Sequence, residues 1–206
     1  MLNRYARAVT TKVFTPLAHL LLRMGLTPDI VTALGTLGVV VSALVLYPLG
    51  HLLIGSLAVT FFVLSDTVDG IMARASGRTG KWGAYLDSTL DRVADGAVFG
   101  GLTIWFARGG DSQLTAGLAL ACLVIGGVVS YAKARAEGLG FSANVGIAER
   151  SERLVVVLVG AGVVGMGAPL VFLQVMLALL AIASLVTVVQ RMSTVRRQAL
   201  AAASEV

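Results

Sequence analysis

Long apolar stretches separated by short polar breaks are the feature that most restricts how this chain can fold. Of its 206 residues, 57% are hydrophobic and only 13% are charged. A soluble domain of this length carries far more charge. Because a membrane-spanning helix needs about 20 apolar residues, the sequence predicts an all-α integral membrane protein with six transmembrane helices. The predicted spans are residues 28–46, 52–75, 82–106, 114–136, 151–164 and 169–189.

The first 24 residues differ from the spans, because Arg4, Arg7 and Lys12 interrupt the apolar run. Apolar residues recur between these cations at helical spacing, which favours an amphipathic juxtamembrane helix in the membrane interface. A short helix packed against the cytoplasmic end of the bundle explains the same pattern. We therefore expect an interfacial helix (1–24), a six-helix domain (25–192) and a basic cytoplasmic tail (193–206).

Basic residues gather on alternate sides of the predicted spans. All of the 16 Lys and Arg residues except Arg92 and Arg108 lie before the first span, between the second and third, between the fourth and fifth, or near the end of the sixth. Positive charge in short loops marks the cytoplasmic side. The sequence therefore predicts a multi-pass protein of the cell membrane with both termini in the cytoplasm.

Four aspartates lie in the second and third spans, close to their predicted cytoplasmic ends. Asp66 and Asp69 are three residues apart, and Asp87 and Asp91 are four apart, so each pair projects from one helix face. A carboxylate at the membrane centre costs roughly 2.5–3.5 kcal/mol, and the two pairs can converge because their spans form a hairpin. Oxygen ligands suit Mg²⁺ or Mn²⁺, and two such ions could clamp a pyrophosphate.

Other interpretations of the four carboxylates stay open at this point. They could line a cation transport pathway, or each could be paired with an arginine for structural reasons. Arg92 and Asp95 are expected to form one such local pair. The nearby cations Arg74, Arg78 and Lys81 favour a site that binds both metal and phosphate.

Fixed spacings join the aspartates to four further residues in one pattern: Asp66-x2-Asp69-Gly70-x2-Ala73-Arg74-x8-Gly83-x3-Asp87-x3-Asp91. This pattern resembles the motif of the CDP-alcohol phosphotransferase family, with every defining position filled. The resemblance implies two Mg²⁺ ions, with Mn²⁺ as the alternative, and transfer of a phosphatidyl group from CDP-diacylglycerol to an alcohol with release of CMP. It further implies that all four aspartates bind metal and that Asp91 is the general base.

The same resemblance implies a binding site for the CDP moiety of the donor. Arg74 would lie near its phosphates, and Thr67 is a further candidate. The segment Thr27-Pro28-Asp29 resembles the family's segment at the start of the first span, although helix capping by Thr27 explains these residues as well. The residues implied for the donor are Thr67, Gly70, Ala73, Arg74, Gly83, Pro28 and Asp29.

A second polar cluster, at the end of the fourth span and the start of the fifth, bears on which alcohol is used. Its cations could hold a phosphate on the acceptor, or they could serve as topology signals and anchors for anionic lipid. Nearly the whole chain resembles the actinobacterial members of the family that make phosphatidylinositol phosphate. That resemblance implies inositol 1-phosphate as acceptor, and the candidates for its phosphate are Ser130, Lys133, Arg135, Arg150, Arg153 and Arg191.

The resemblance also implies a homodimer in the lipid membrane, and no nucleic-acid partner is expected. Glycerol 3-phosphate, which is also phosphorylated, is the alternative acceptor. A divalent-cation transporter is the alternative from a different functional class. Transport would not require Gly70, Ala73, Arg74 and Gly83 at fixed offsets from the aspartates.

Overall fold

The computed structural model describes the backbone of residues 2–77 and 80–204, and the side chains of that part except those of residues 2–12 and of Asp66. The described residues form helices and connecting turns, without strands. The helices are α1 (Leu2–Arg23), α2 (Pro28–Leu46), α3 (Leu52–Val63), α4 (Ser65–Ala75), α5 (Lys81–Arg108), α6 (Gln113–Gly138), α7 (Arg150–Gly165) and α8 (Leu170–Ala203).

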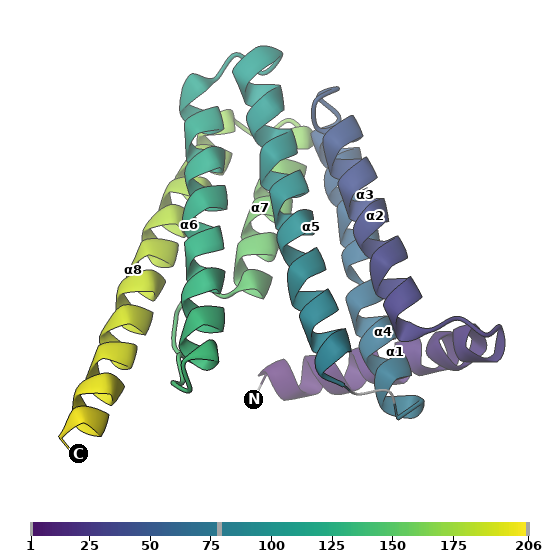
Figure 1. Ribbon diagram of the computed structural model, residues 1–206. Coiled ribbons are helices and arrows are strands. Elements are labelled where there is room, and N and C mark those ends of the chain that lie inside the picture. Colours follow the sequence, from purple (N-terminus) through teal and green to yellow (C-terminus); the bar gives the residue numbers. More distant parts are fainter. Residues whose placement is uncertain (1, 78–79, 205–206) are drawn as a thin grey trace.

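Helices α2 to α8 form a bundle, in which α4 continues α3, while α1 lies across one end of it (Figure 1). Helix α5 packs against α2 and α6, α6 packs against α8, and α3 packs against α7. The core between them is apolar and includes Val98, Phe99, Leu102, Leu173 and Leu177, each 1% exposed or less. Helix α5 therefore lies between α2 and α6, and α7 lies between α3 and α8.

Helix α1 contacts the bundle through one face and leaves apolar side chains uncovered on another. Ala18 is fully buried in a small cluster with residues of α2 and α4, whereas Val13, Leu17 and Leu20 are exposed. Pro16 lies within α1 without ending it. The prediction of an interfacial helix also rests on Arg4, Arg7 and Lys12, whose side chains lie outside the described residues.

The start of α2 follows the capping pattern expected from the sequence. The hydroxyl of Thr27 accepts a hydrogen bond from the backbone nitrogen of Ile30 at 3.4 Å, and Pro28 occupies the first turn, where its missing N–H is not needed. The helix ends at the predicted turn, where buried Tyr47 contacts the hydroxyl of Ser56 in α3 at 3.2 Å. This turn fixes α2 and α3 as an antiparallel pair.

The predicted second span is interrupted, because α3 ends at Val63 and α4 begins at Ser65. The Ser65 hydroxyl donates to the carbonyl of Phe62 at 2.6 Å, and the backbone nitrogen of Thr67 bonds the carbonyl of Leu64 at 3.1 Å. A hydroxyl that donates to a backbone carbonyl in this way competes with the regular hydrogen bonds of the helix. The interruption directly precedes the first pair of aspartates.

Four described segments are long and apolar enough to cross a membrane: Pro28–Leu46, Leu52–Ala75, Gln113–Gly138 and Leu170–Ala203. Helix α5 has 28 residues but carries several charges in its first half, and α7 has only 16 residues. Large apolar side chains cover the outside of the bundle, as in Ile54, Phe61, Val124, Leu179 and Ile182. The protein is thus a multi-pass membrane protein, because such a surface requires lipid around it.

Candidate active site

The two pairs of aspartates lie on α4 and α5, which both pack against α2. Asp69 is buried, and the hydroxyl of Thr32 in α2 donates a hydrogen bond to its Oδ2 at 2.5 Å. The same hydroxyl lies 3.0 Å from the carbonyl of Pro28. Because a hydroxyl has only one proton to donate, the first turn of α2 and the carboxylate of α4 share it. Thr32 therefore orients Asp69.

Asp91 is held by cations from two helices. Its Oδ1 lies 2.7 Å from Nη1 of Arg150 at the start of α7, and its Oδ2 lies 3.7 Å from Nη2 of Arg92. Asp87, one turn earlier on α5, is exposed. Arg150, which is predicted to bind the acceptor phosphate, therefore contacts Asp91, which is predicted to be the general base.

The predicted metal ligands fit a divalent ion by their chemistry, since carboxylate oxygens are the ligands that Mg²⁺ and Mn²⁺ prefer. Among the residues with described side chains, no three His, Cys, Asp or Glu gather closely enough to hold a metal. The fourth predicted ligand, Asp66, lies outside the described side chains. The complete ligand set therefore stays a prediction.

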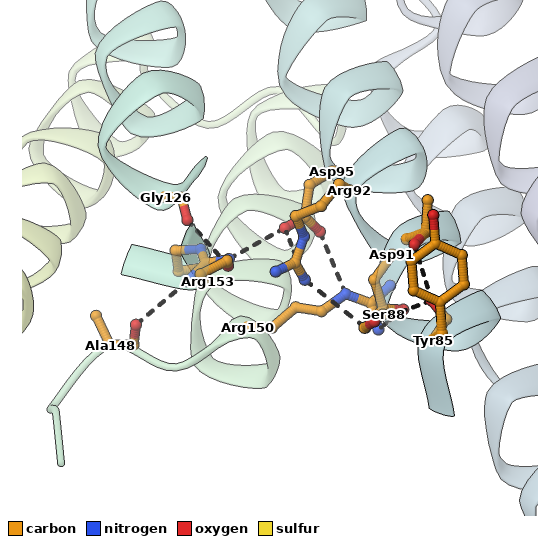
Figure 2. A network of polar contacts seen from close by, with 11 residues as sticks. Tyr85, Ser88, Asp91, Arg92, Asp95, Gly126, Ala148, Arg150 and Arg153 are labelled. Atoms are coloured by element: carbon orange, nitrogen blue, oxygen red, sulfur yellow. Dashed lines mark hydrogen bonds and ion pairs between the residues drawn. The ribbon is translucent and has the colours of Figure 1, made fainter. Parts of the chain in front are cut away.

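A network of charges, buried at Asp95 and Arg153, joins α5 to α7 (Figure 2). Asp95 accepts from Nη2 of Arg153 at 3.0 Å and from Nε of Arg150 at 3.3 Å. The predicted local pair between Arg92 and Asp95 is present, at 3.8 Å. Arg153 is 1% exposed and also donates to the carbonyl of Ala148 at 3.3 Å. The first turn of α7 is thus fastened to the middle of α5.

The residues predicted to bind the donor lie at the start of α2, along α4 and at the start of α5. Arg74 is exposed, and its guanidinium lies beside Gly70, where an added Cβ would be 3.5 Å from Nη1. Asp29 accepts a hydrogen bond from Nε1 of Trp82 at 3.1 Å, which joins the starts of α2 and α5. An added Cβ at Gly83 would meet no atom within 4 Å. Thr67 and Ala73 are half-buried, and Pro28 is buried.

The residues predicted for the acceptor phosphate divide into two groups. Arg150 and Arg153 lie in the network with the aspartates of α5. Arg191 on α8 is 3% exposed and donates to the carbonyls of Val129 at 2.6 Å and Val145 at 2.9 Å. It fastens α6 and the loop before α7 to α8. The remaining candidates, in the last turns of α6, are Ser130, Lys133 and Arg135.

Three residues hold this site together through contacts that sequence reasoning did not identify: Thr32, Trp82 and Asp95, which it paired only with Arg92. Asp95 has a visible signal, because it continues the four-residue spacing of Asp87 and Asp91 on the same face of α5. No signal in the sequence identifies Thr32 and Trp82, because their partners Asp69 and Asp29 belong to other helices.

Comparison with known proteins identifies the family. The CDP-alcohol phosphatidyltransferase family model matches residues 25–190. The chain belongs to the CDP-alcohol phosphatidyltransferase family. It is therefore an enzyme of this family, which decides against the cation transporter that the aspartates alone left open.

Relatives within the family are similar over nearly the whole chain. The phosphatidylinositol phosphate synthase of Streptomyces avermitilis is 53% identical over 204 residues, covering 96% of this chain and 84% of that protein. The crystal structure of Mycobacterium tuberculosis phosphatidylinositol phosphate synthase with CDP-DAG bound is 49% identical, with a TM-score of 0.84 and coverage of 89% of this chain and 94% of that one. The structure of the same enzyme with manganese and citrate has a TM-score of 0.85 at 49% identity, covering 88% of each chain.

Proposed function

We propose that the protein transfers the phosphatidyl group of CDP-diacylglycerol to inositol 1-phosphate, giving phosphatidylinositol phosphate and CMP. The family membership supports the reaction class, and the name shared by relatives about half identical to this chain supports the acceptor. The observation that carries the proposal in the structure is the 2.7 Å contact between Arg150 and Asp91. A cation suited to a phosphate lies beside the carboxylate suited to the attacking hydroxyl.

The reaction proceeds by attack of an acceptor hydroxyl on the donor phosphorus that carries diacylglycerol. A new P–O bond forms to the acceptor, and the bond from that phosphorus to the bridging oxygen breaks, so CMP leaves with the oxygen. Asp91 accepts the hydroxyl proton, because an alcohol does not ionise by itself near neutral pH. Arg74 binds the phosphates of the CDP moiety, and Arg150 binds the phosphate of the acceptor.

Two divalent ions, Mg²⁺ or Mn²⁺, would be held by the motif aspartates and would neutralise charge on the pyrophosphate when bound. The manganese complex of the Mycobacterium tuberculosis enzyme supports a divalent ion in this chain. Thr32 supports the proposal as well, because a ligating carboxylate needs a hydrogen-bond partner that fixes its orientation. The proposed ligands are Asp66, Asp69, Asp87 and Asp91.

The membrane arrangement proposed for the enzyme has six spans, with α3 and α4 together forming the second. Helices α5 and α7 are included because they pack among the four long apolar segments. The distribution of basic residues supports cytoplasmic termini and a cytoplasmic site, where the donor's head group is reached while its acyl chains stay in lipid. Helix α1 lies in the interface between membrane and water, and residues 193–206 lie in the cytoplasm. The protein is proposed to form a homodimer.

Release of CMP from CDP-diacylglycerol tests the proposal in detergent with Mg²⁺. Inositol 1-phosphate, free inositol and glycerol 3-phosphate are offered separately. We expect release with inositol 1-phosphate and little with free inositol, because the arginines at the start of α7 select a phosphate. Release with glycerol 3-phosphate alone would keep the mechanism and replace the acceptor, whereas release without any need for a phosphate would contradict the role of Arg150.

A further inference from the structure

We propose that Asp95 is a positioning residue for the acceptor side of the site and acts through Arg150, which it contacts directly and whose helix it anchors through Arg153. The inference deepens the proposed function and rests on it. Asp95 lies four residues beyond the last aspartate of the family pattern, on the same face of α5 as Asp91. The side chain of Asp95 is 9% exposed, so it faces the protein interior.

The first step of the argument is the way Arg150 spans two carboxylates. Its Nη1 lies 2.7 Å from Oδ1 of Asp91, and its Nε lies 3.3 Å from Oδ1 of Asp95. A planar guanidinium can donate in two directions at once, and it is pre-organised when both are satisfied. Asp95 therefore holds one edge of Arg150 and sets the position of the rest of its guanidinium beside Asp91.

The second step is the anchoring of α7. Oδ2 of Asp95 accepts from Nη2 of Arg153 at 3.0 Å, and the Arg153 side chain is only 2% exposed. A guanidinium so deeply buried needs a counter-charge, because removing one partner of a buried pair is strongly destabilising. Arg150 lies one helical turn before Arg153, so the pair between Arg153 and Asp95 also fixes the backbone from which Arg150 extends.

The third step concerns the charge of the network. Two carboxylates, Asp91 and Asp95, face three guanidinium groups, those of Arg92, Arg150 and Arg153. If Asp95 only moderated this positive charge, its removal would strengthen attraction of an anionic acceptor and lower its KM. If Asp95 positions the arginines, its removal raises that KM. The two roles thus predict changes of opposite sign.

Steady-state kinetics of Asp95→Asn, Arg150→Lys and the double variant test the proposal, with KM measured for inositol 1-phosphate and for CDP-diacylglycerol. We expect Asp95→Asn to raise the acceptor KM by about tenfold or more, since small misplacement of a binding group has large effects, and to change the donor KM by less than about threefold. Glu152→Gln is the control, because it removes the same charge from an exposed position on the first turn of α7.

The double variant shows whether Asp95 acts through Arg150. Lysine keeps the charge but cannot bridge Asp91 and Asp95, so the double variant should have an acceptor KM close to that of the worse single variant. Multiplied effects, or an acceptor KM that falls or stays unchanged in Asp95→Asn, would overturn the proposal. Equal rises in both KM values would do so as well, because they would indicate a general structural role.

A second variant covers the case in which Asp95→Asn does not accumulate. Asp95→Glu keeps the counter-charge for Arg153 but moves the carboxylate by one methylene, so the acceptor KM should still rise while the protein remains folded. An unchanged acceptor KM in Asp95→Glu would contradict positioning by Asp95. Wild-type protein that releases no CMP with inositol 1-phosphate would instead overturn the proposed function, and the two failures are thereby distinguished.

Discussion

The guanidinium of Arg150 lies 2.7 Å from the carboxylate of Asp91 and joins the first turn of α7 to α5. The two residues are predicted to serve opposite ends of one substrate, the phosphate and the attacking hydroxyl. A phosphate that binds Arg150 must share this guanidinium with Asp91. The acceptor would therefore arrive at the carboxylate that has to receive its proton.

Asp91→Asn should abolish transfer while leaving donor binding. An amide cannot accept the hydroxyl proton, and loss of a positioned base typically lowers the rate by about 10²–10⁴-fold. CMP release measures the transfer, and stabilisation of the purified protein by CDP-diacylglycerol in thermal unfolding measures donor binding. Asp111→Asn, in the turn between α5 and α6, is the control, because asparagine tolerates the positive φ of 43° found there. Joint loss of transfer and donor binding in Asp91→Asn would indicate that Asp91 is mainly a metal ligand.

Thr32→Val should weaken metal binding without removing any predicted ligand. Valine has the shape of threonine but cannot donate to Asp69, and loss of such a supporting partner typically lowers metal affinity by about 10–100-fold. Electron paramagnetic resonance of free Mn²⁺ during titration measures the affinity directly. Thr36→Val is the matched control, since Thr36 is buried one turn further along α2. Equal affinities in the two variants would show that Thr32 does not support a metal ligand.

Much of the fold and the reaction class could be predicted from local sequence. Apolar length predicts the helices, and the capping of α2 by Thr27 needs only adjacent residues. The interruption at Leu64 was not predicted, because it depends on which backbone carbonyl accepts a hydrogen bond from the Ser65 hydroxyl. The spacing of the four aspartates can be read within 26 consecutive residues, so the family resemblance needs no knowledge of the fold.

The environment of the arginines could not be predicted in the same way. Arg153 and Arg191 lie near the ends of predicted spans, a position that in a membrane protein usually indicates contact with lipid head groups or water. Their burial depends on partners far away in sequence, such as Asp95 and the carbonyl of Val129. Only the packing of α5, α6, α7 and α8 brings these groups together. Whether the two arginines also contact the acceptor stays a prediction.

Gly126→Ala should disturb the acceptor site from the side of α6. An added Cβ would lie 3.0 Å from Nε of Arg153, which is tighter than ordinary contact, so the Arg153 side chain must leave the position in which it bonds Asp95. We expect a higher KM for the acceptor, by about two- to tenfold if the shift is a few tenths of an ångström. Gly127→Ala is the control, since its Cβ would meet no atom within 4 Å. An effect of equal size in both variants would assign it to helix propensity and not to Arg153.

Gly101→Ala should lower the stability of the bundle, whereas Gly100→Ala should not. Alanine is favoured over glycine within a helix by about 0.8–1.0 kcal/mol, so both changes would be stabilising if nothing else intervened. A methyl group at Gly101 overlaps the backbone carbonyl of Ala43 in α2, while one at Gly100 meets no atom within 4 Å. A backbone carbonyl cannot rotate away as the side chain of Phe62 could beside Gly38, and overpacking typically costs about 1–3 kcal/mol.

Thermal unfolding in detergent, followed by loss of helical circular dichroism, measures the difference between the two variants. We expect a Tm several degrees below that of wild type for Gly101→Ala, and a Tm equal to or above wild type for Gly100→Ala. Because α2 carries Thr32 and α5 carries Asp91, separation of these helices should also lower activity in Gly101→Ala at temperatures below its Tm. A stable and fully active Gly101→Ala variant would show that α2 and α5 are not held as closely as the contact between Gly101 and Ala43 requires.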